Sequence, residues 1–326
     1  MPDRSEITSV TPGIGRRTFL KGVGGLAGAV VLGACNPGRS ASSDGGQLVR
    51  VKSWGDLGYP SPFVYVAGPG YWRMSLLFDT LTWPDSTGTQ LPWLASSYKK
   101  SEDGLVWSVE LRDVKWADGR PLTARDVAFT YNYYTSRTFT PLLTGVPKAG
   151  VDVRAIGDRT VEFRLPKPEA TFLQQTLGTM PIVPEHVFAK IADPMTVFDK
   201  SVFMGSGAYT LASKNVNADT ELYVARDDYY LGRPFVPRIE MLGVPDDDEL
   251  AALRAGVLDG ASAAEEGARN EVLAPFRDDP AFGLLEQPAG FGFPLFFNMS
   301  KGGPLADLRF RRGCLHAIDR EDMVNR

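Results

Sequence analysis

Residues 105–134 read LVWSVELRDVKWADGRPLTARDVAFTYNYY. The first half alternates apolar and polar side chains, which predicts a strand with one buried face. The DGRP sequence at 118–121 predicts a tight turn, because glycine adopts positive φ easily and proline fixes its own φ. Thr123, followed three residues later by Asp126, predicts the start of a capped helix. The segment is therefore expected to form a strand, a turn and a helix.

This segment resembles the motif lRdgvkFsDGtplTAeDV of the family 5 (peptide/nickel) solute-binding proteins of ABC importers. The matching residues, 111–119 and 121–127, are turn, cap and core residues, so they indicate the family and do not place a ligand. Further resemblances to the family follow in order along residues 48–326. They lie at 91–98 (LPWLASSY), 180–186 (MPIVPEH), 205–211 (GSGAYTL), 250–260 (LAALRAGVLDG) and 304–320 (PLADLRFRRGCLHAIDR).

Composition excludes several classes of protein. The 326 residues are 43% hydrophobic and 23% charged, which is an ordinary globular balance. The net charge is −4, and the first 34 residues hold four basic and two acidic side chains, so the rest of the chain carries −6. That sign argues against general nucleic-acid binding. The two cysteines, Cys35 and Cys314, are too few for a disulfide framework or for a zinc site with four cysteine ligands. The two histidines, His186 and His316, offer little for a histidine-based metal site, and we expect no cofactor or metal.

The N-terminal residues resemble an export signal. Arg16 and Arg17 begin RRTFLK, which is similar to the twin-arginine motif, and an apolar run over 22–34 follows. This run is shorter than the roughly 20 residues of a membrane-spanning helix but suits a signal peptide. It ends in LGAC at Cys35, which resembles a lipobox, so Cys35 is the expected lipidation site. The alternative is a buried helix with an incidental cysteine.

The signal implies an exported lipoprotein, anchored to the membrane and facing the periplasm or the outer side of the cytoplasmic membrane. Residues 1–34 would be the signal peptide. Residues 35–46 (CNPGRSASSDGG) would be a flexible tether.

The family resemblance implies a mixed α/β fold of the periplasmic-binding-protein-like class II clamshell type. Lobe I would comprise 47–82 and 203–300, with an inserted α+β subdomain at 83–202. Residues 301–326 would begin lobe II. Family members are longer, so we expect most of lobe II to lie outside this sequence and the chain alone to bind its ligand weakly or not at all, because two lobes normally enclose the ligand.

Sequence patterns predict further elements. Strands are expected at 47–53, 151–156, 160–165, 220–226, 237–244 and 291–298; helices are expected at 71–81, 169–177, 246–258 and 304–320. In the last helix Asp307 is the expected cap, with Leu308, Cys314, Leu315 and Ile318 on the side that lobe II would bury. Without that lobe we expect Leu308, Leu315 and Ile318 to expose apolar surface. The glycine-rich 205–211 segment is interpreted as a hinge or crossing segment.

Five residues are predicted to line an open ligand groove of lobe I. The aromatic-rich loop after the first strand, which faces the cleft in the family, supplies most of them. Asp56 is available for a polar end of the ligand. The set is Asp56, Tyr59, Tyr71, Phe293 and Asn298. The alternative for the aromatic members is ordinary core packing.

The resemblance implies a non-catalytic binding protein, expected to be a monomer, that captures an oligopeptide or another small solute and delivers it to ABC permease subunits. Whether the ligand is a peptide, nickel or a sugar stays open. One alternative is a non-functional remnant of such a protein. A weaker alternative is a secreted hydrolase, based on Ser206 between two glycines, but this motif is not GxSxG. His186 is interpreted as a turn or packing residue.

Overall fold

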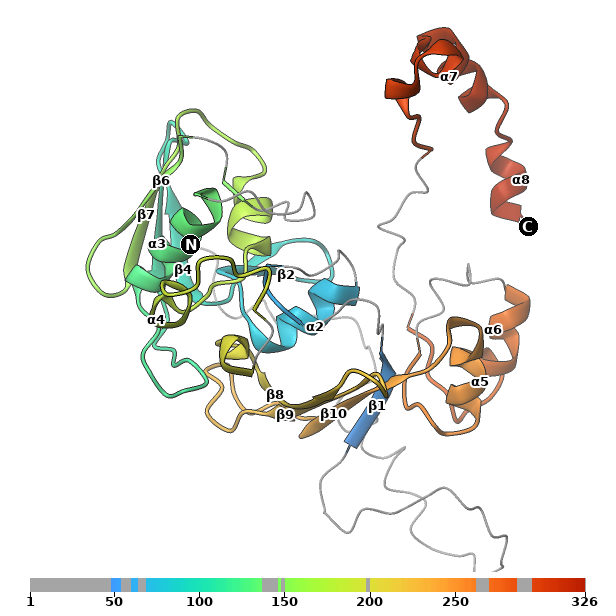
Figure 1. Ribbon diagram of the computed structural model, residues 1–326, viewed down its shortest axis with the longest axis horizontal. Helices are drawn as coiled ribbons and strands as arrows, with labels where there is room; N and C mark the ends of the chain where they lie inside the picture. The colour runs from blue at the N-terminus through green and yellow to red at the C-terminus, as the bar shows by residue number, and fades with distance from the viewer. Residues whose placement is uncertain are drawn as a thin grey trace, which may run out of the picture. The chain divides into compact units, whose positions relative to one another are not determined.

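A computed structural model describes most of the chain after residue 47 (Figure 1). The described residues are 48–53, 60–63, 69–136, 146–147, 150–197, 200–261, 270–285 and 295–325. Helices and strands are interspersed along them, so the expected mixed α/β class is confirmed.

Four strands form the first sheet, in the order β1-β10-β9-β8 (Figure 1). Their bounds are Leu48–Ser53 for β1, Tyr209–Asn215 for β8, Thr220–Ala225 for β9 and Arg238–Gly243 for β10. β1 pairs with β10 in parallel, with Val51 opposite Met241, whereas the other pairs are antiparallel. Strands expected at 47–53, 220–226 and 237–244 are therefore confirmed, and the chain returns to its first strand after almost 190 residues.

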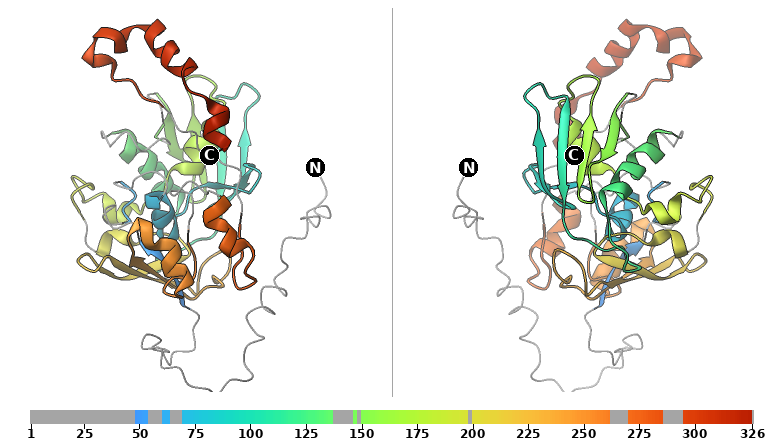
Figure 2. Two further views of the ribbon diagram at one scale, coloured as in Figure 1. Left: turned by 90° about the vertical axis from the view of Figure 1, so that its right-hand side faces the viewer. Right: turned by 90° about the vertical axis from the view of Figure 1, so that its left-hand side faces the viewer.

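A second four-stranded sheet is antiparallel throughout, in the order β4-β5-β7-β6. Its strands are β4 (Ala95–Lys100), β5 (Val106–Leu111), β6 (Asp152–Ala155) and β7 (Thr160–Arg164). Helix α3 (Ala124–Thr135) lies along one face (Figure 2). There Tyr131 of α3 meets Phe163 of β7 edge to face, with ring centroids 4.9 Å apart. A short hairpin, β2 (Thr82–Pro84) with β3 (Gln90–Pro92), precedes this sheet.

The 105–134 segment folds as its sequence predicts. Trp107, Val109 and Leu111 of β5 are buried, and their neighbours along the strand are more exposed. Gly119 has φ +85°, so the turn uses the conformation that glycine adopts easily. The backbone N–H of Thr123 donates to Asp126 Oδ2 over 2.9 Å, and α3 begins at the next residue.

The glycine-rich segment before β8 packs against the end of helix α2 (Pro69–Leu77). The N–H of Gly207 donates to the Leu77 carbonyl oxygen over 2.8 Å. A Cβ on Gly205 would lie 1.7 Å from that same oxygen, so only glycine fits there. Arg226 reinforces the crossing, because its guanidinium donates to the carbonyl oxygens of Gly205, Gly207 and Lys115.

The other helices are short. They are η2, a π-helix (Phe172–Leu177), α4 (Glu185–Phe188), η3 (Lys200–Phe203), η4 (Asp246–Asp248), α5 (Glu249–Arg254), α6 (Asn270–Arg277), η5 (Met299–Lys301), η6 (Gly303–Ala306), α7 (Leu308–His316) and α8 (Arg320–Asn325). No helix in the described part of the chain is both long and apolar enough to span a membrane.

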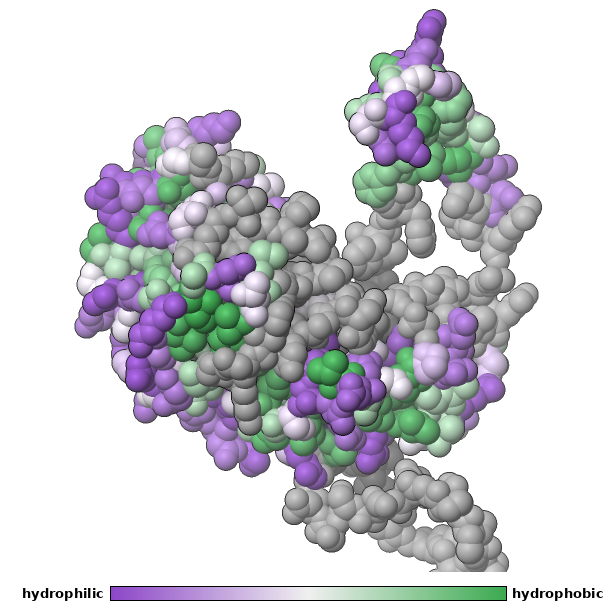
Figure 3. Space-filling model, viewed as in Figure 1, coloured by the Kyte–Doolittle hydropathy of each residue, from purple (hydrophilic) through white to green (hydrophobic). Residues whose placement is uncertain are grey.

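One expectation near the C-terminal end of the sequence is wrong. Residues 295–298 are not a strand, because they pair with no strand among the described residues. The expected exposure of the apolar side of α7 is confirmed: Leu308 is 52% and Leu315 44% exposed, and Ile318, just beyond the helix, is 36% exposed. Figure 3 shows apolar surface on this segment. The physical reason is that α7 packs mainly on the short turn η6, which cannot cover a helix face. The cap is confirmed, since Asp307 accepts from the N–H of Arg309 over 2.8 Å.

Candidate ligand-binding site

Three half-buried aromatic side chains form a row, called the aromatic row below. Tyr71 lies in α2, Trp83 in β2 and Trp93 between β3 and β4. The rings of Tyr71 and Trp83 are stacked, with centroids 6.1 Å apart and planes at 16°. The rings of Trp83 and Trp93 are 5.9 Å apart and tilted by 35°. Such a row offers apolar contact area to a ligand while it keeps the rigidity of a packed cluster.

Polar contacts hold both ends of the row. The Tyr71 hydroxyl donates to the Gly178 carbonyl oxygen over 3.4 Å. At the other end, Trp93 Nε1 donates to Asp79 Oδ1 over 3.1 Å. These bonds therefore join α2 to the segment after η2, and they join the chain between β3 and β4 to the chain just beyond α2.

Asp79 is a buried carboxyl group, 4% exposed. The Tyr229 hydroxyl donates to Oδ1 over 3.3 Å, so this oxygen accepts two hydrogen bonds. Burial raises the pKa of Asp79 from 3.8 to about 6, and the side-chain donors around it, of which Trp93 acts most strongly, oppose the shift. Burial also raises the pKa values of the Tyr229 and Tyr230 hydroxyls, so both stay protonated at neutral pH.

A buried charge cluster fixes α2 on the first sheet. Arg73 of α2 and Lys214 of β8 both contact Glu221 of β9, at 2.8 Å and 2.5 Å. The Tyr223 hydroxyl donates to the other oxygen of Glu221. All four side chains are almost completely buried, and burial together with the Glu221 charge raises the pKa of Tyr223 well above 10. The cluster orients the helix that carries Tyr71.

Of the five predicted groove residues, the structure describes two, Tyr71 and Asn298. Tyr71 is half-buried and belongs to the aromatic row. Asn298 is exposed, and its Oδ1 accepts from the Ser300 hydroxyl. The structure records no contact between these two residues, so the groove remains a prediction. Six predicted residues lie outside the described part of the chain: Asp56, Tyr59, Phe293, Cys35, Arg16 and Arg17.

Sequence reasoning missed Trp83 and Trp93 as the other members of the aromatic row, and Asp79 as the partner of Trp93. A signal was present, because Trp83 and Trp93 flank a short turn-rich stretch that a hairpin would close. The contribution of Asp79 had no such signal, since its partner Tyr229 is 150 residues away.

The hydrolase alternative finds no support at Ser206. Its side chain is completely buried, and its hydroxyl accepts from the Asp79 backbone N–H over 3.4 Å. His186 is engaged elsewhere, with Nε2 2.9 Å from Asp118 Oδ2. His186 lies in the one-turn helix α4 rather than in a turn, and this contact ties the helix to the turn around Asp118.

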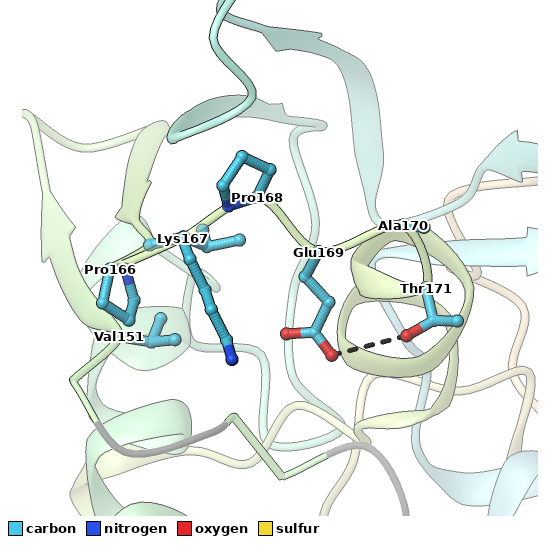
Figure 4. Close-up of a pocket in the computed structure, with 8 residues that line it drawn as sticks. Val151, Pro166, Lys167, Pro168, Glu169, Ala170 and Thr171 are labelled. Carbon is cyan, nitrogen blue, oxygen red and sulfur yellow. Dashed lines mark hydrogen bonds between the residues drawn. The ribbon is translucent and has the colours of Figure 1, made fainter.

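A separate pocket of about 270 Å³ lies beside the chain between β7 and η2 (Figure 4). It is lined by Val151, Leu165, Pro166, Lys167, Pro168, Glu169, Ala170 and Thr171. Lys167 and Glu169 reach into it, and Glu169 accepts from the Thr171 hydroxyl over 3.4 Å. The pocket contains no member of the aromatic row. No group of three or more His, Cys, Asp or Glu side chains within the described ranges is arranged to hold a metal ion.

Comparisons with known proteins give a consistent result. The model of the bacterial extracellular solute-binding proteins, family 5 (middle region), matches residues 89–326. The oligopeptide-binding protein AppA of Bacillus subtilis is 28% identical over 248 residues, which cover 70% of this chain and 44% of AppA. The chain spans about half the length of the curated relatives it matches.

Solved structures share the fold. NikZ from Campylobacter jejuni in complex with Ni(L-His) has a TM-score of 0.71 at 24% identity, over 86% of this chain and 54% of NikZ. AppA from Bacillus subtilis in complex with a nonapeptide has a TM-score of 0.57 at 26% identity, over 65% of this chain and 43% of AppA. These structures therefore contain a counterpart of most of the described fold.

Proposed function

Because the chain belongs to the bacterial extracellular solute-binding proteins of family 5, we propose that it is the substrate-binding component of an ABC importer. It captures a peptide or a related solute outside the cytoplasm and delivers it to the permease. The family match carries this proposal. The action is binding rather than catalysis, with the energy coming from hydrogen bonds and side-chain contacts.

A peptide is the favoured ligand. The relative AppA is named an oligopeptide-binding protein and has been solved with a nonapeptide, and it has a higher identity to this chain than the nickel-complex structure has. The aromatic row adds a physical argument, because half-buried aromatic rings contact side chains of many kinds without demanding one sequence. Nickel complexed with histidine is the alternative ligand.

We place Tyr71, which the structure describes, in the wall that contacts the ligand. Trp83 joins it, because the two rings are stacked and half-buried. Asp56, Tyr59, Phe293 and Asn298 complete the proposed groove. In this arrangement 47–82 and 203–300 form one lobe, and 83–202 is inserted into it.

We also propose that the protein is exported through the twin-arginine signal at Arg16 and Arg17 and anchored by a lipid on Cys35. An anchor of this kind would keep the binding protein next to its permease. The tether at 35–46 would give the folded part freedom to reach both solute and permease.

Calorimetric titration tests the ligand class on the chain completed by the second lobe of the relative AppA, because the chain alone is expected to bind weakly or not at all. A random nonapeptide library and Ni(L-His) are titrated separately, first on the wild type and then on Tyr71→Ala and Trp83→Ala. We expect the library to bind and each substitution to weaken binding about tenfold, the loss of one aromatic contact.

The matched control is Phe235→Ala, which removes an aromatic side chain that is 64% exposed and lies outside the row. It should leave the affinity unchanged. Binding of Ni(L-His) alone would replace the peptide assignment by the nickel one. Absence of binding by both probes would contradict the proposed function, and equal loss in all three variants would contradict the placement of the site.

A further inference from the structure

Asp79 lies where four segments of the chain converge. Its backbone oxygen accepts from the Ile182 N–H over 3.0 Å, and its backbone N–H donates to the Ser206 hydroxyl over 3.4 Å. Its carboxylate accepts from Trp93 and Tyr229. A single buried residue, through its backbone and its side chain, thereby connects the end of α2 with segments that are up to 150 residues away in the sequence.

The hydrogen bond from Trp93 Nε1 to Asp79 fixes the orientation of the Trp93 indole ring. The backbone of Trp93 is already fixed, since its N–H donates to Leu81 O over 3.0 Å and its carbonyl oxygen accepts from Arg112 Nε over 2.7 Å. The Nε1 bond to Asp79 is the polar contact recorded for its side chain among the described residues. Trp93 in turn contacts Trp83, and Trp83 stacks on Tyr71. The orientation of the Trp93 ring therefore limits the positions open to the rings of Trp83 and Tyr71.

We propose that Asp79 is a positioning residue that holds the aromatic row, through Trp93, in the arrangement that Trp83 and Tyr71 present to the ligand. The inference rests on the proposed function, in which Tyr71 and Trp83 belong to the ligand-contacting wall. Asp79 itself is buried and does not touch the ligand.

The charge of Asp79 sets how firmly the row is held. Tyr229 and Tyr230 are the titratable side chains that act on Asp79 among the described residues, and both stay neutral because burial raises their pKa values. Asp79 Oδ2 is buried without a hydrogen-bond partner in the described part, so Oδ1 is the oxygen that holds Trp93. An ionised carboxylate is a stronger acceptor than a neutral one. With a pKa of about 6, Asp79 should hold the row more firmly above pH 6 than below it.

Near-ultraviolet circular dichroism tests the positioning directly, because the signal of two neighbouring indoles depends on their mutual orientation. The spectra of the wild type, Asp79→Asn and Asp79→Ala are recorded from pH 5 to pH 8. The wild type should change with a midpoint near 6. Asp79→Asn keeps an acceptor but no charge, so it should show the acid-form spectrum at every pH. Asp79→Ala should lose most of the signal of the row.

The matched control is Asp85→Asn. This carboxyl is six residues further on and bonds within its own turn, to Thr87 and Thr89. Its variant should reproduce the wild-type spectra and their pH dependence. A wild-type spectrum that stays constant with pH, or an unchanged spectrum in Asp79→Ala, would overturn the proposal. If Asp79→Ala does not fold, the comparison of the wild type with Asp79→Asn still decides.

Binding of the random nonapeptide library by the same lobe-completed chain supplies the functional readout. Wild-type affinity should fall about fivefold from pH 7.5 to pH 5, the difference between a charged and a neutral hydrogen bond. The affinity of Asp79→Asn should not change with pH, whereas the affinity of the Asp85→Asn control should fall as that of the wild type does. Binding that depends on pH equally in all variants overturns the link to the ligand. If the wild type binds no peptide, the proposed function fails, whereas the spectra still decide whether Asp79 positions the row.

Discussion

Replacing Asp79 by asparagine should stabilise the protein at neutral pH. The carboxyl is 4% exposed, and burial raises its pKa from 3.8 to about 6. The folded state therefore keeps a proton at pH values where the unfolded chain has released it. Folding stability linked to this group is fully present below pH 3.8 and is lost as the pH rises through about 6.

The size of the effect follows from the two pKa values. Their difference corresponds to about 3 kcal/mol of unfolding free energy at neutral pH, of which about half develops above pH 5. Asparagine has nearly the same shape, accepts from Trp93 through its oxygen and never ionises. The stability gap between Asp79→Asn and the wild type should thus widen in favour of the variant as the pH rises from 5 to 7.5.

Urea denaturation at a series of pH values, followed by far-ultraviolet circular dichroism, measures this gap. Asp85→Asn is the control, because hydrogen bonds from Thr87 lower the pKa of Asp85 and place its titration below this range. Its gap to the wild type should not change between pH 5 and 7.5. A constant gap for Asp79→Asn as well would refute the assignment of a raised pKa to a buried Asp79.

Three further outcomes are expected. Gly205→Ala should destabilise the protein by about 3 kcal/mol or more, since the new Cβ would collide with Leu77 O, whereas Gly283→Ala, with no atom nearby, should be close to neutral in the same denaturation assay. Glu221→Gln should cost about 3–5 kcal/mol in unfolding free energy, because it leaves two buried cations without their shared anion. Cys35→Ala should abolish incorporation of radiolabelled palmitate and release the protein from the membrane fraction; a variant that fractionates as the wild type does would contradict the lipid anchor.

Controls separate these effects from general damage. For Glu221→Gln the matched change is Glu162→Gln, since Glu162 forms an ion pair with Arg164 whose members are 24% and 58% exposed. Surface pairs of this kind contribute about 1 kcal/mol or less. Equal losses in the two variants would show that the buried cluster has no special role.

Local structure was predictable wherever the signal lies within a few residues. The strand β5, the Gly119 turn and the Thr123 cap depend on alternation, positive φ and a capping box, and each acts over a handful of neighbours. The same holds for the hairpin of β6 and β7 around Gly157. The wrong prediction, a strand at 295–298, depended on a pairing partner that the local pattern does not specify.

The candidate site was only partly predictable. Tyr71 could be selected because it lies in an aromatic-rich stretch that follows the first strand. Its stacking on Trp83 could not, because two rings separated by a helix end and a turn meet only after both segments pack.

Sequence motifs alone indicated the family and the local elements, because motif spacing and periodicity are encoded by adjacent residues. Only the tertiary structure decided that β1 pairs with β10, that Glu221 receives Arg73 and Lys214, and that Asp79 lies beneath Trp93. These contacts join segments far apart in the chain. Their geometry follows from the simultaneous packing of both sheets and α2, and this packing also excludes the water that would otherwise keep the pKa of Asp79 near 4.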